Sequence, residues 1–449
     1  MTEKELIETA KSAASVLAGK GLNGFDVYVR ASSSTSVEVR ERTLDAFEEA
    51  STWGVGIRAL RTDSRMGFAF STGSPDAGIE AARQAVENAS IAEPDEYNVI
   101  AGLPTDVYPD VVEFDETASS LTEAEKIDRA VRVEAAALDA DPRIKRVRKA
   151  SASYSEAAWA IVSSNGLEVS SRGTYFSTGV MAVAESDGES QMGYDFDTRR
   201  RQSEIDYAAV GRAAAMEALS LLGARKPSSG LYPVILDNRI ATEFLGVLAS
   251  SFSAEAVIKG RSLLADKVGT KVCSELINIH DDGLMPGGAA TRSFDDEGIP
   301  CRRTPLIVEG VFRGFLQNTY TAAKTGSFTT GNAARGGFRS QPTVGLMNLY
   351  IERGDKTPEE LVGSVKNGLL VNGVLGMHTA NPVSGDFSVG VSGMWITDGK
   401  TSYPVREAAV SGNILDIFAG VEAVGSDLKF MGRMGSPSLL LRPLSISGS

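Results

Sequence analysis

Apolar residues in the first part of the chain recur with two alternating periods. Residues 2–19 repeat every three to four positions, which predicts an amphipathic helix. Residues 25–73 alternate apolar and polar side chains, as the strands of an antiparallel sheet with one buried face do. Helical spacing returns in residues 75–90, where Pro75 suits a helix start, and in residues 121–140. We therefore expect helices packed on a sheet.

The strand pattern resumes from residue 144 to about residue 196. The Asn165-Gly166 pair inside this stretch is a strong signal for a β-hairpin. A helix predicted over residues 207–224 then leads to a Lys-Pro-Ser-Ser-Gly stretch at 226–230, whose composition suits a domain boundary. No sequence repeat of fixed period is visible along the chain.

The second half begins with a strand over residues 231–237 and an amphipathic helix over residues 239–260. Beyond that helix the chain is rich in glycine, serine and β-branched residues, with one further clear helix at 357–368. We expect an α+β protein of two domains. The N-terminal α/β domain (1–225) has an antiparallel sheet flanked by helices, and the C-terminal domain (226–449) is β-rich with few helices.

Composition narrows the classes of function. The chain has 449 residues, 42% of them hydrophobic, and a net charge of −13, which disfavours nucleic acid or an anionic membrane as a partner. The N-terminal stretch lacks the apolar run of a signal peptide or membrane span, so we expect a cytoplasmic protein. Cys273 and Cys301 form no disulfide framework and are interpreted as reduced thiols.

Three stretches could carry chemistry, and each has a plainer interpretation. A cluster of acids and one histidine could hold a divalent cation, although ordinary Asp-Gly turns are favoured. The cluster comprises His280, Asp281, Asp282, Asp295, Asp296 and Glu297. His378 with Asp386 is a candidate pair for acid–base catalysis, but a histidine in a glycine-rich loop is more often structural. Residues 330–338 lack the Walker lysine that a phosphate cradle needs.

The second half carries longer motifs that point to a known family. They are DDEGIPCRRTPLIVEGVFRGFLQNTYTAAKTGSFTTGNAARG, the strand MNLYIERGD, NPVSGDFSVGVSGMWITDG with YPVREAAVSGNILDIFAGVEAVGSDL, and GSPSLLL. These motifs resemble the TldD/PmbA family of modulators of DNA gyrase and their associated proteases. The resemblance covers about residues 230–449 closely and the first half more loosely, where the order of helices and strands agrees.

The resemblance also implies where a zinc site would lie. Members of the TldD branch carry an H-E-x-x-x-H motif on a helix and a distant cysteine ligand, as a zinc protease requires. The histidine positions fall on Leu245 and Ser250, the glutamate position on Gly246, and the cysteine position on about Met431. No histidine occurs between residues 1 and 279, so no shift of register restores the motif. We expect no metal and no other cofactor in this chain.

The loop that contains His378 is similar to the other branch, called PmbA or TldE. The residues that carry this match are Asn381, Ser384, Gly385, Asp386, Ser388, Trp395, Tyr403, Pro404 and Glu407. The resemblance implies a subunit that pairs with a zinc-bearing TldD-like chain and helps to cleave unfolded peptides. A homodimer, instead of or in addition to this heterodimer, is the other expected assembly. The alternatives are a self-sufficient peptidase that uses His280 or His378 with Asp386, and a regulatory binding protein linked to gyrase toxins or antitoxins.

Peptide contact is predicted at two segments that could offer a free sheet edge or loop, and at the His378 loop. The candidate residues are Gly331, Asn332, Arg335, Asn348, Tyr350, Ser384, Gly385 and Asp386. The plainer interpretation of both segments is ordinary sheet and turn.

Overall fold

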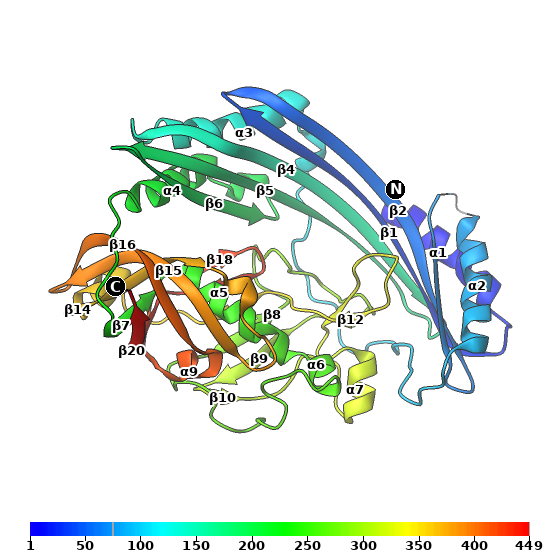
Figure 1. The fold of residues 1–449 in the computed structure, drawn as a ribbon. Helices are drawn as coiled ribbons and strands as arrows, with labels where there is room; N and C mark the ends of the chain where they lie inside the picture. The colour runs from blue at the N-terminus through cyan, green and yellow to red at the C-terminus, as the bar shows by residue number, and fades with distance from the viewer. Residues whose placement is uncertain (74–75, 449) are drawn as a thin grey trace.

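The structure, a computed structural model, describes residues 1–73 and 76–448 (Figure 1). A long curved sheet from the first half of the chain arches over a β-rich second half. The first half contains α1 (Glu3–Leu17), β1 (Leu22–Arg40), β2 (Thr43–Arg61), β3 (Met66–Ser71), α2 (Ala77–Ile91), η1 (Ala118–Ser120), α3 (Glu123–Leu138), β4 (Ile144–Ser163), β5 (Glu168–Ser186), β6 (Glu189–Arg199), η2 (Gln202–Glu204) and α4 (Tyr207–Ser220).

The second half contains shorter elements. They are β7 (Gly230–Leu236), α5 (Asn238–Ala249), η3 (Ser250–Phe252), α6 (Ala254–Ile258), β8 (Ile279–Asp282), β9 (Arg303–Val308), β10 (Val311–Phe312), α7 (Thr319–Thr325), β11 (Ala333–Ala334), β12 (Thr343–Val344), β13 (Leu349–Ile351), α8 (Pro358–Gly363), β14 (Asn367–Leu375), η4 (Met377–Thr379), β15 (Asp386–Thr397), β16 (Lys400–Asn413), α9 (Ile414–Ala419), β17 (Val421–Val424), β18 (Lys429–Met431), β19 (Met434–Ser436) and β20 (Leu439–Ser447). The predicted α+β class is confirmed.

The first-half sheet has the antiparallel order β3-β2-β1-β4-β5-β6. The helices α1 to α4 cover opposite ends of one face of the sheet. The contacts of β4 show this, since residues two apart on a strand point to the same face. Ala150 and Ala152 of β4 pack in a core with α3 and α4, whereas Ala158 and Ala160 pack in a core with α1 and α2. Trp159, of the opposite parity, faces the second half and packs with Phe294 and Phe338.

The first half repeats one arrangement twice: helix, three strands, helix. The strand order is symmetric about the β1–β4 pair, and α1 and α3 both begin with a Thr-Glu capping box. Gly67 of β3 and Gly193 of β6 lie at equivalent places, each against the backbone of the neighbouring helix. The structure therefore contains a duplicated unit of helix, three strands and helix, although the sequence shows no repeat of fixed period.

Several expected elements are confirmed, and others differ from the expectation. The helix expected over residues 357–368 is only α8, because the chain enters β14 at Asn367, and α7 and α9 are two further short helices that the pattern did not indicate. Gly166, at φ +86°, makes the β4–β5 hairpin that the Asn165-Gly166 pair predicted. Pro75 lies outside the described residues. The predicted single helix over residues 239–260 is instead α5, η3 and α6. Serine side chains interrupt it by bonding nearby backbone: Ser253 accepts from the Glu255 N–H and Ser251 from the Leu263 N–H.

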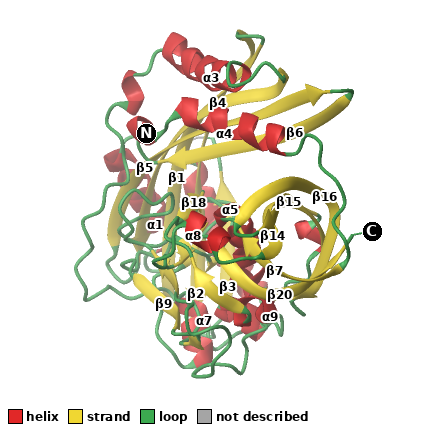
Figure 2. Cartoon of the chain, turned by 90° about the vertical axis from the view of Figure 1, so that its left-hand side faces the viewer, coloured by secondary structure: helices red, strands yellow, loops and turns green. Residues whose placement is uncertain are grey.

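The second half has two six-stranded sheets, β16-β15-β14-β7-β20-β17 and β10-β9-β8-β13-β19-β18. The first curls so far that β16 also pairs with β20 (Figure 2). The main core of the second half lies around α5. It includes Leu236 from β7, Ile279 from β8 and Val389 from β15.

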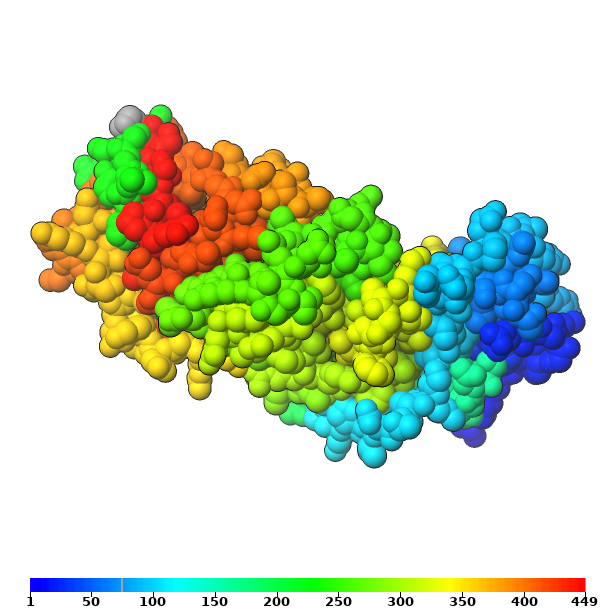
Figure 3. Space-filling model, turned by 90° about the horizontal axis from the view of Figure 1, so that it is seen from below, coloured from blue at the N-terminus to red at the C-terminus, as the bar shows by residue number. Residues whose placement is uncertain are grey.

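The extended segment 92–117 runs from the first-half sheet along the second half, and the view from below shows the N-terminal residues, in blue, at one end of the molecule (Figure 3). The Tyr108 hydroxyl in this segment donates to the Gly298 carbonyl at 2.9 Å, and the Tyr320 hydroxyl donates to Asp95 at 2.8 Å. None of the helices in the described residues has the length and apolar content to cross a membrane.

Candidate functional site

The positions where the resemblance places zinc ligands adjoin one another in the fold. Asp237 starts α5 by accepting the Ile240 N–H at 2.8 Å, and α5 packs on the β18–β19 hairpin. A Cβ added to Gly246 would lie 3.5 Å from Met434 Cε of that hairpin. The predicted cysteine position, Met431, is the last residue of β18.

The residues at these positions do not fit a zinc ion. Leu245 is fully buried in the apolar core, Gly246 has no side chain, and Ser250 is exposed just past the end of α5. Zinc sites need imidazole, thiolate or carboxylate groups, which these residues cannot supply. Elsewhere in residues 1–73 and 76–448, no group of three or more His, Cys, Asp and Glu side chains is placed to hold a metal ion.

His280 and Asp281 do not converge, because neighbouring strand residues point to opposite faces. His280 Nε2 lies 3.0 Å from a Glu352 carboxylate oxygen, and burial together with the Arg303 charge lowers the pKa of His280. Asp281 on the other face accepts from Asn332 Nδ2 at 2.6 Å and from the Met347 N–H at 2.9 Å. Burial raises the pKa of Asp281 to about 7.

The acidic pairs form turns, as the plainer interpretation predicted. Asp282 accepts the Leu284 N–H at 2.8 Å, and Asp295 accepts the Glu297 N–H at 2.9 Å. Both are side-chain turns that bond the backbone two residues ahead. Burial and the neighbouring Glu297 charge raise the pKa of Asp295 to about 7.

The remaining acids of this cluster join a buried ionic network between the two halves. Asp296 accepts from Arg292 Nη2 at 2.9 Å and from the Arg335 N–H at 2.7 Å. Arg335 Nη2 reaches Asp26 of β1 at 2.8 Å. Arg58 of β2 contacts that same carboxylate at 2.5 Å and Glu297 at 3.1 Å. Sequence reasoning placed Asp296 and Glu297 in turns and Arg335 in peptide contact, and it missed their pairing with Asp26 and Arg58 across the chain.

The expectation of a free edge at MNLYIERG is wrong. Its strand, β13, lies inside a sheet, pairing with β8 on one side and β19 on the other. Asn348 is fully buried, and its Nδ2 donates to the Asp282 carbonyl at 2.6 Å. Gly331 and Asn332 are buried too. Peptide contact at these residues and at Tyr350 stays a prediction without the support of an exposed edge.

The His378 loop is an exposed turn held by its own polar groups. Asn381 Oδ1 accepts the Val383 N–H at 2.8 Å, and Gly385 takes φ +81°. Asp386 accepts from Asn413 Nδ2 at 3.0 Å, and hydrogen bonding to Ser384 and then to Asn413 lowers the pKa of Asp386. No hydrogen bond or ion pair within the described chain joins Asp386 to His378. The structure therefore does not assemble the predicted acid–base pair.

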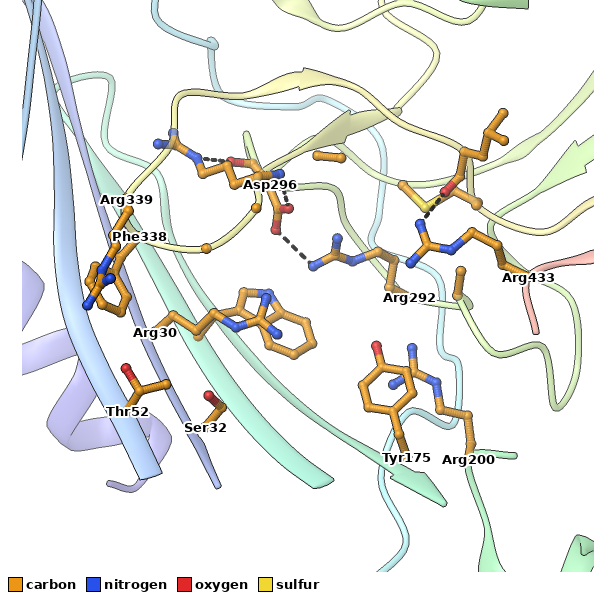
Figure 4. A pocket seen from close by; sticks show the side chains of 18 residues that line it. Arg30, Ser32, Thr52, Tyr175, Arg200, Arg292, Asp296, Phe338, Arg339 and Arg433 are labelled. Carbon is orange, nitrogen blue, oxygen red and sulfur yellow. Dashed lines mark hydrogen bonds and ion pairs between the residues drawn. The ribbon is translucent and has the colours of Figure 1, made fainter. Parts of the chain in front are cut away.

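A cavity of about 580 Å³ opens between the concave face of the long sheet and the loops of the second half (Figure 4). Its arginines come from distant parts of the chain: Arg30, Arg200, Arg292, Arg335, Arg339 and Arg433. Trp159, Tyr175 and Phe338 also line it. Sequence reasoning missed most of this set. The run of three arginines at 199–201, unusual in an acidic chain, was the one local signal.

Three profiles of one family match this chain. The PmbA/TldA metallopeptidase domain 1 matches residues 25–91, the central domain matches residues 116–222, and the C-terminal domain matches residues 229–448. Together they cover both halves of the chain and each unit of the internal duplication.

Full-length relatives agree with these profiles. Metalloprotease PmbA of Escherichia coli O157:H7 is 28% identical over 99% of this chain and 97% of its own length. A metalloprotease of Methanothermobacter thermautotrophicus is 28% identical over 91% of this chain and 90% of its own.

Solved structures share the whole fold. A protein from Thermotoga maritima described as a modulator of a DNA gyrase superposes with a TM-score of 0.90 at 26% identity, covering 98% of this chain and 99% of that one. TldE from Thermococcus kodakarensis has a TM-score of 0.88 at 23% identity, with full coverage of both chains.

Proposed function

Since this chain belongs to the PmbA/TldD metallopeptidase family, we propose that it is a zinc-free, TldE-like subunit of a TldD/TldE-type protease complex. In this proposal a TldD-like partner carries the zinc ion, and the complex cleaves unstructured peptides. The chain shares its fold along its full length with TldE from Thermococcus kodakarensis.

One observation carries the proposal: α5 is an apolar core helix at the place where the resemblance puts the zinc motif. Leu245 is fully buried among core residues, and Gly246 packs near Met434. A zinc-bound water also needs a general base beside it, and glycine at the glutamate position cannot supply one. The chain's own contribution is then structural: it forms an interface and a wall, while hydrolysis occurs in the partner.

Co-purification with a TldD-like chain, followed by metal analysis of each chain, tests the proposal. We expect the chain alone to contain less than stoichiometric zinc and to leave an unstructured peptide such as casein intact. The complex should contain zinc and cleave the peptide. Replacing the zinc-motif histidines of the partner should abolish cleavage, while the complex itself should persist.

Stoichiometric zinc together with peptidase activity in the chain alone would overturn the proposal. In that case His280→Ala and His378→Ala would identify the group responsible, since these are the two histidines of the chain. If the proposal is right, both variants should cleave as well as the unmodified chain does in the complex. His378 is exposed, so its replacement should leave the fold unchanged.

A further inference from the structure

We propose that the arginine-lined cavity between the two halves binds a small polyanion that carries two or more phosphate or carboxylate groups. The cavity lies between β1, β2, β4 and β5 on one side and the loops around Arg292, Arg335 and Arg433 on the other. This site needs neither a zinc ion nor a partner chain, so it stands independently of the proposed protease pairing.

Charge balance is the first argument. Six arginines and one carboxylate, Asp296, line the cavity, although the whole chain has a net charge of −13. Arg292 and Arg335 have carboxylate partners in Asp296 and Asp26. The other four arginines have no carboxylate within 4.0 Å among residues 1–73 and 76–448. They are Arg30, Arg200, Arg339 and Arg433.

Unsatisfied donors are the second argument. Arg200 is 3% exposed, and its Nη2 donates to the Thr291 carbonyl at 2.8 Å, while Nε and Nη1 find no acceptor in the described chain. Arg335 Nη1 and Trp159 Nε1 are likewise buried without an acceptor there. Buried donors are costly to leave unpaired, and charged ones most of all. An oxyanion in the cavity would offset this cost.

The electrostatics of Arg200 point the same way. Burial lowers the pKa of Arg200, and the nearby positive charge of Arg292 acts in the same direction. The Arg200 guanidinium lies 4.1 Å from the Tyr175 ring centre, and the more distant Glu113 charge supports it without a direct ion pair. A bound anion would stabilise both guanidinium groups at once.

The arrangement of the arginines sets the class of ligand. Guanidinium groups bind carboxylate and phosphate through two parallel N–H bonds, and here they come from both walls of the cavity. A ligand with two or more oxyanion groups can pair with arginines on both walls at once. Ser32 and Thr52 add hydroxyl groups on the sheet side. A volume of about 580 Å³ suits a small organic ligand.

Titration calorimetry of the full chain in low-salt buffer tests the proposal, with pyrophosphate and citrate as probes. We expect at least one probe to bind, and to bind more weakly as sodium chloride is added. The double variant Arg30→Gln, Arg433→Gln should lose about tenfold or more in affinity, because it removes charge-assisted bonds from both walls. Tighter binding of pyrophosphate would assign a phosphate ligand, and tighter binding of citrate a carboxylate ligand.

Matched variants guard against misfolding and non-specific attraction. Arg132→Gln on α3 removes one charge from a side chain that is 67% exposed and does not line the cavity, so this variant should bind the probes like the unmodified chain. Arg433→Gln alone replaces an exposed side chain and should fold normally, with a smaller loss of affinity. Failure of both probes to bind the unmodified chain, or equal affinity in the double variant, would overturn the proposal.

Discussion

At the scale of single residues, burial changes what an acid does. Asp281 and Asp295 looked like candidate metal ligands in the sequence, yet each accepts backbone N–H groups in the interior. Burial raises the pKa of both to about 7. A carboxyl group that is hard to ionise serves better as a structural hydrogen-bonding group than as a cation ligand.

Asp281→Asn should change the pH dependence of stability. The folded-state pKa of about 7 lies above the ordinary value of 3.8, so the native state holds the proton more tightly than the unfolded state does. Asp281 therefore costs no stability below pH 3.8 and progressively more as the pH rises to about 7. The free energy of unfolding of the variant, minus that of the unmodified chain, should rise by at most about 1.4 kcal/mol per pH unit in this window.

Urea unfolding at a series of pH values measures this difference. Asp386→Asn is the control, because Asp386 is exposed and its pKa is lowered from 3.8. Any pH dependence that Asp386 gives to the free energy of unfolding should therefore lie at acidic pH, outside the window of Asp281. A flat difference for Asp281→Asn between pH 4 and 7 would show that Asp281 ionises normally in the folded chain.

At the scale of elements, close helix packing explains two glycines that sequence patterns left unremarked. A Cβ on Gly67 would lie 2.0 Å from the Ala85 carbonyl oxygen of α2, and a Cβ on Gly193 would lie 2.2 Å from the Ala214 carbonyl oxygen of α4. These equivalent strands meet their helices backbone to backbone. The alanine-rich faces of α2 and α4 allow the same close approach.

Gly67→Ala and Gly193→Ala should therefore each destabilise the chain by about 1–3 kcal/mol, as overpacking does. Gly246→Ala on α5 is the matched control, because its new methyl group would meet Met434 Cε at an ordinary 3.5 Å. Alanine is the better helix former, so this variant should gain about 0.5–1 kcal/mol. Chemical denaturation measures all three. Equal effects at the three sites would refute the close-packing argument.

At the scale of the whole molecule, a buried ionic network joins the halves at their centre, beside the small apolar cluster in which Trp159 packs with Phe294 and Phe338. The cores around α1 and α2, around α3 and α4, and around α5 are separate. Between them, Arg58, Asp26 and Arg335 of the ionic network are each at most 6% exposed. Such pairs contribute little net stability while complete, but removing one member leaves a buried charge unpaired.

Arg58→Met should lower the free energy of unfolding by about 3–5 kcal/mol, because it leaves Glu297 without its arginine and Asp26 with only one. Thermal and urea unfolding would report the loss. Arg132→Ala, which breaks an exposed pair with Asp128, should change stability by less than about 0.5 kcal/mol. A similarly small effect for Arg58→Met would mean that the network does not hold the halves together.

The sequence by itself determined the class of elements, the first-half order of helices and strands, and the hairpin at Gly166, because these depend on local periodicity and turn chemistry. It also shows that Leu245, Gly246 and Ser250 carry no imidazole, thiolate or carboxylate group, since ligand chemistry belongs to the side chain. It overestimated the helix over residues 239–260, which serines interrupt.

Only the tertiary structure decided the rest. Whether β13 is an edge depends on β8 and β19, which lie more than 60 residues away in the chain. The cavity arginines lie on strands and loops that span residues 30 to 433, and no local pattern relates them. Burial sets the cost of an unpaired charge, and burial exists only after the chain has folded. Only the folded chain therefore shows that Arg58 has two carboxylate partners while two donors of Arg200 have no acceptor in the described residues.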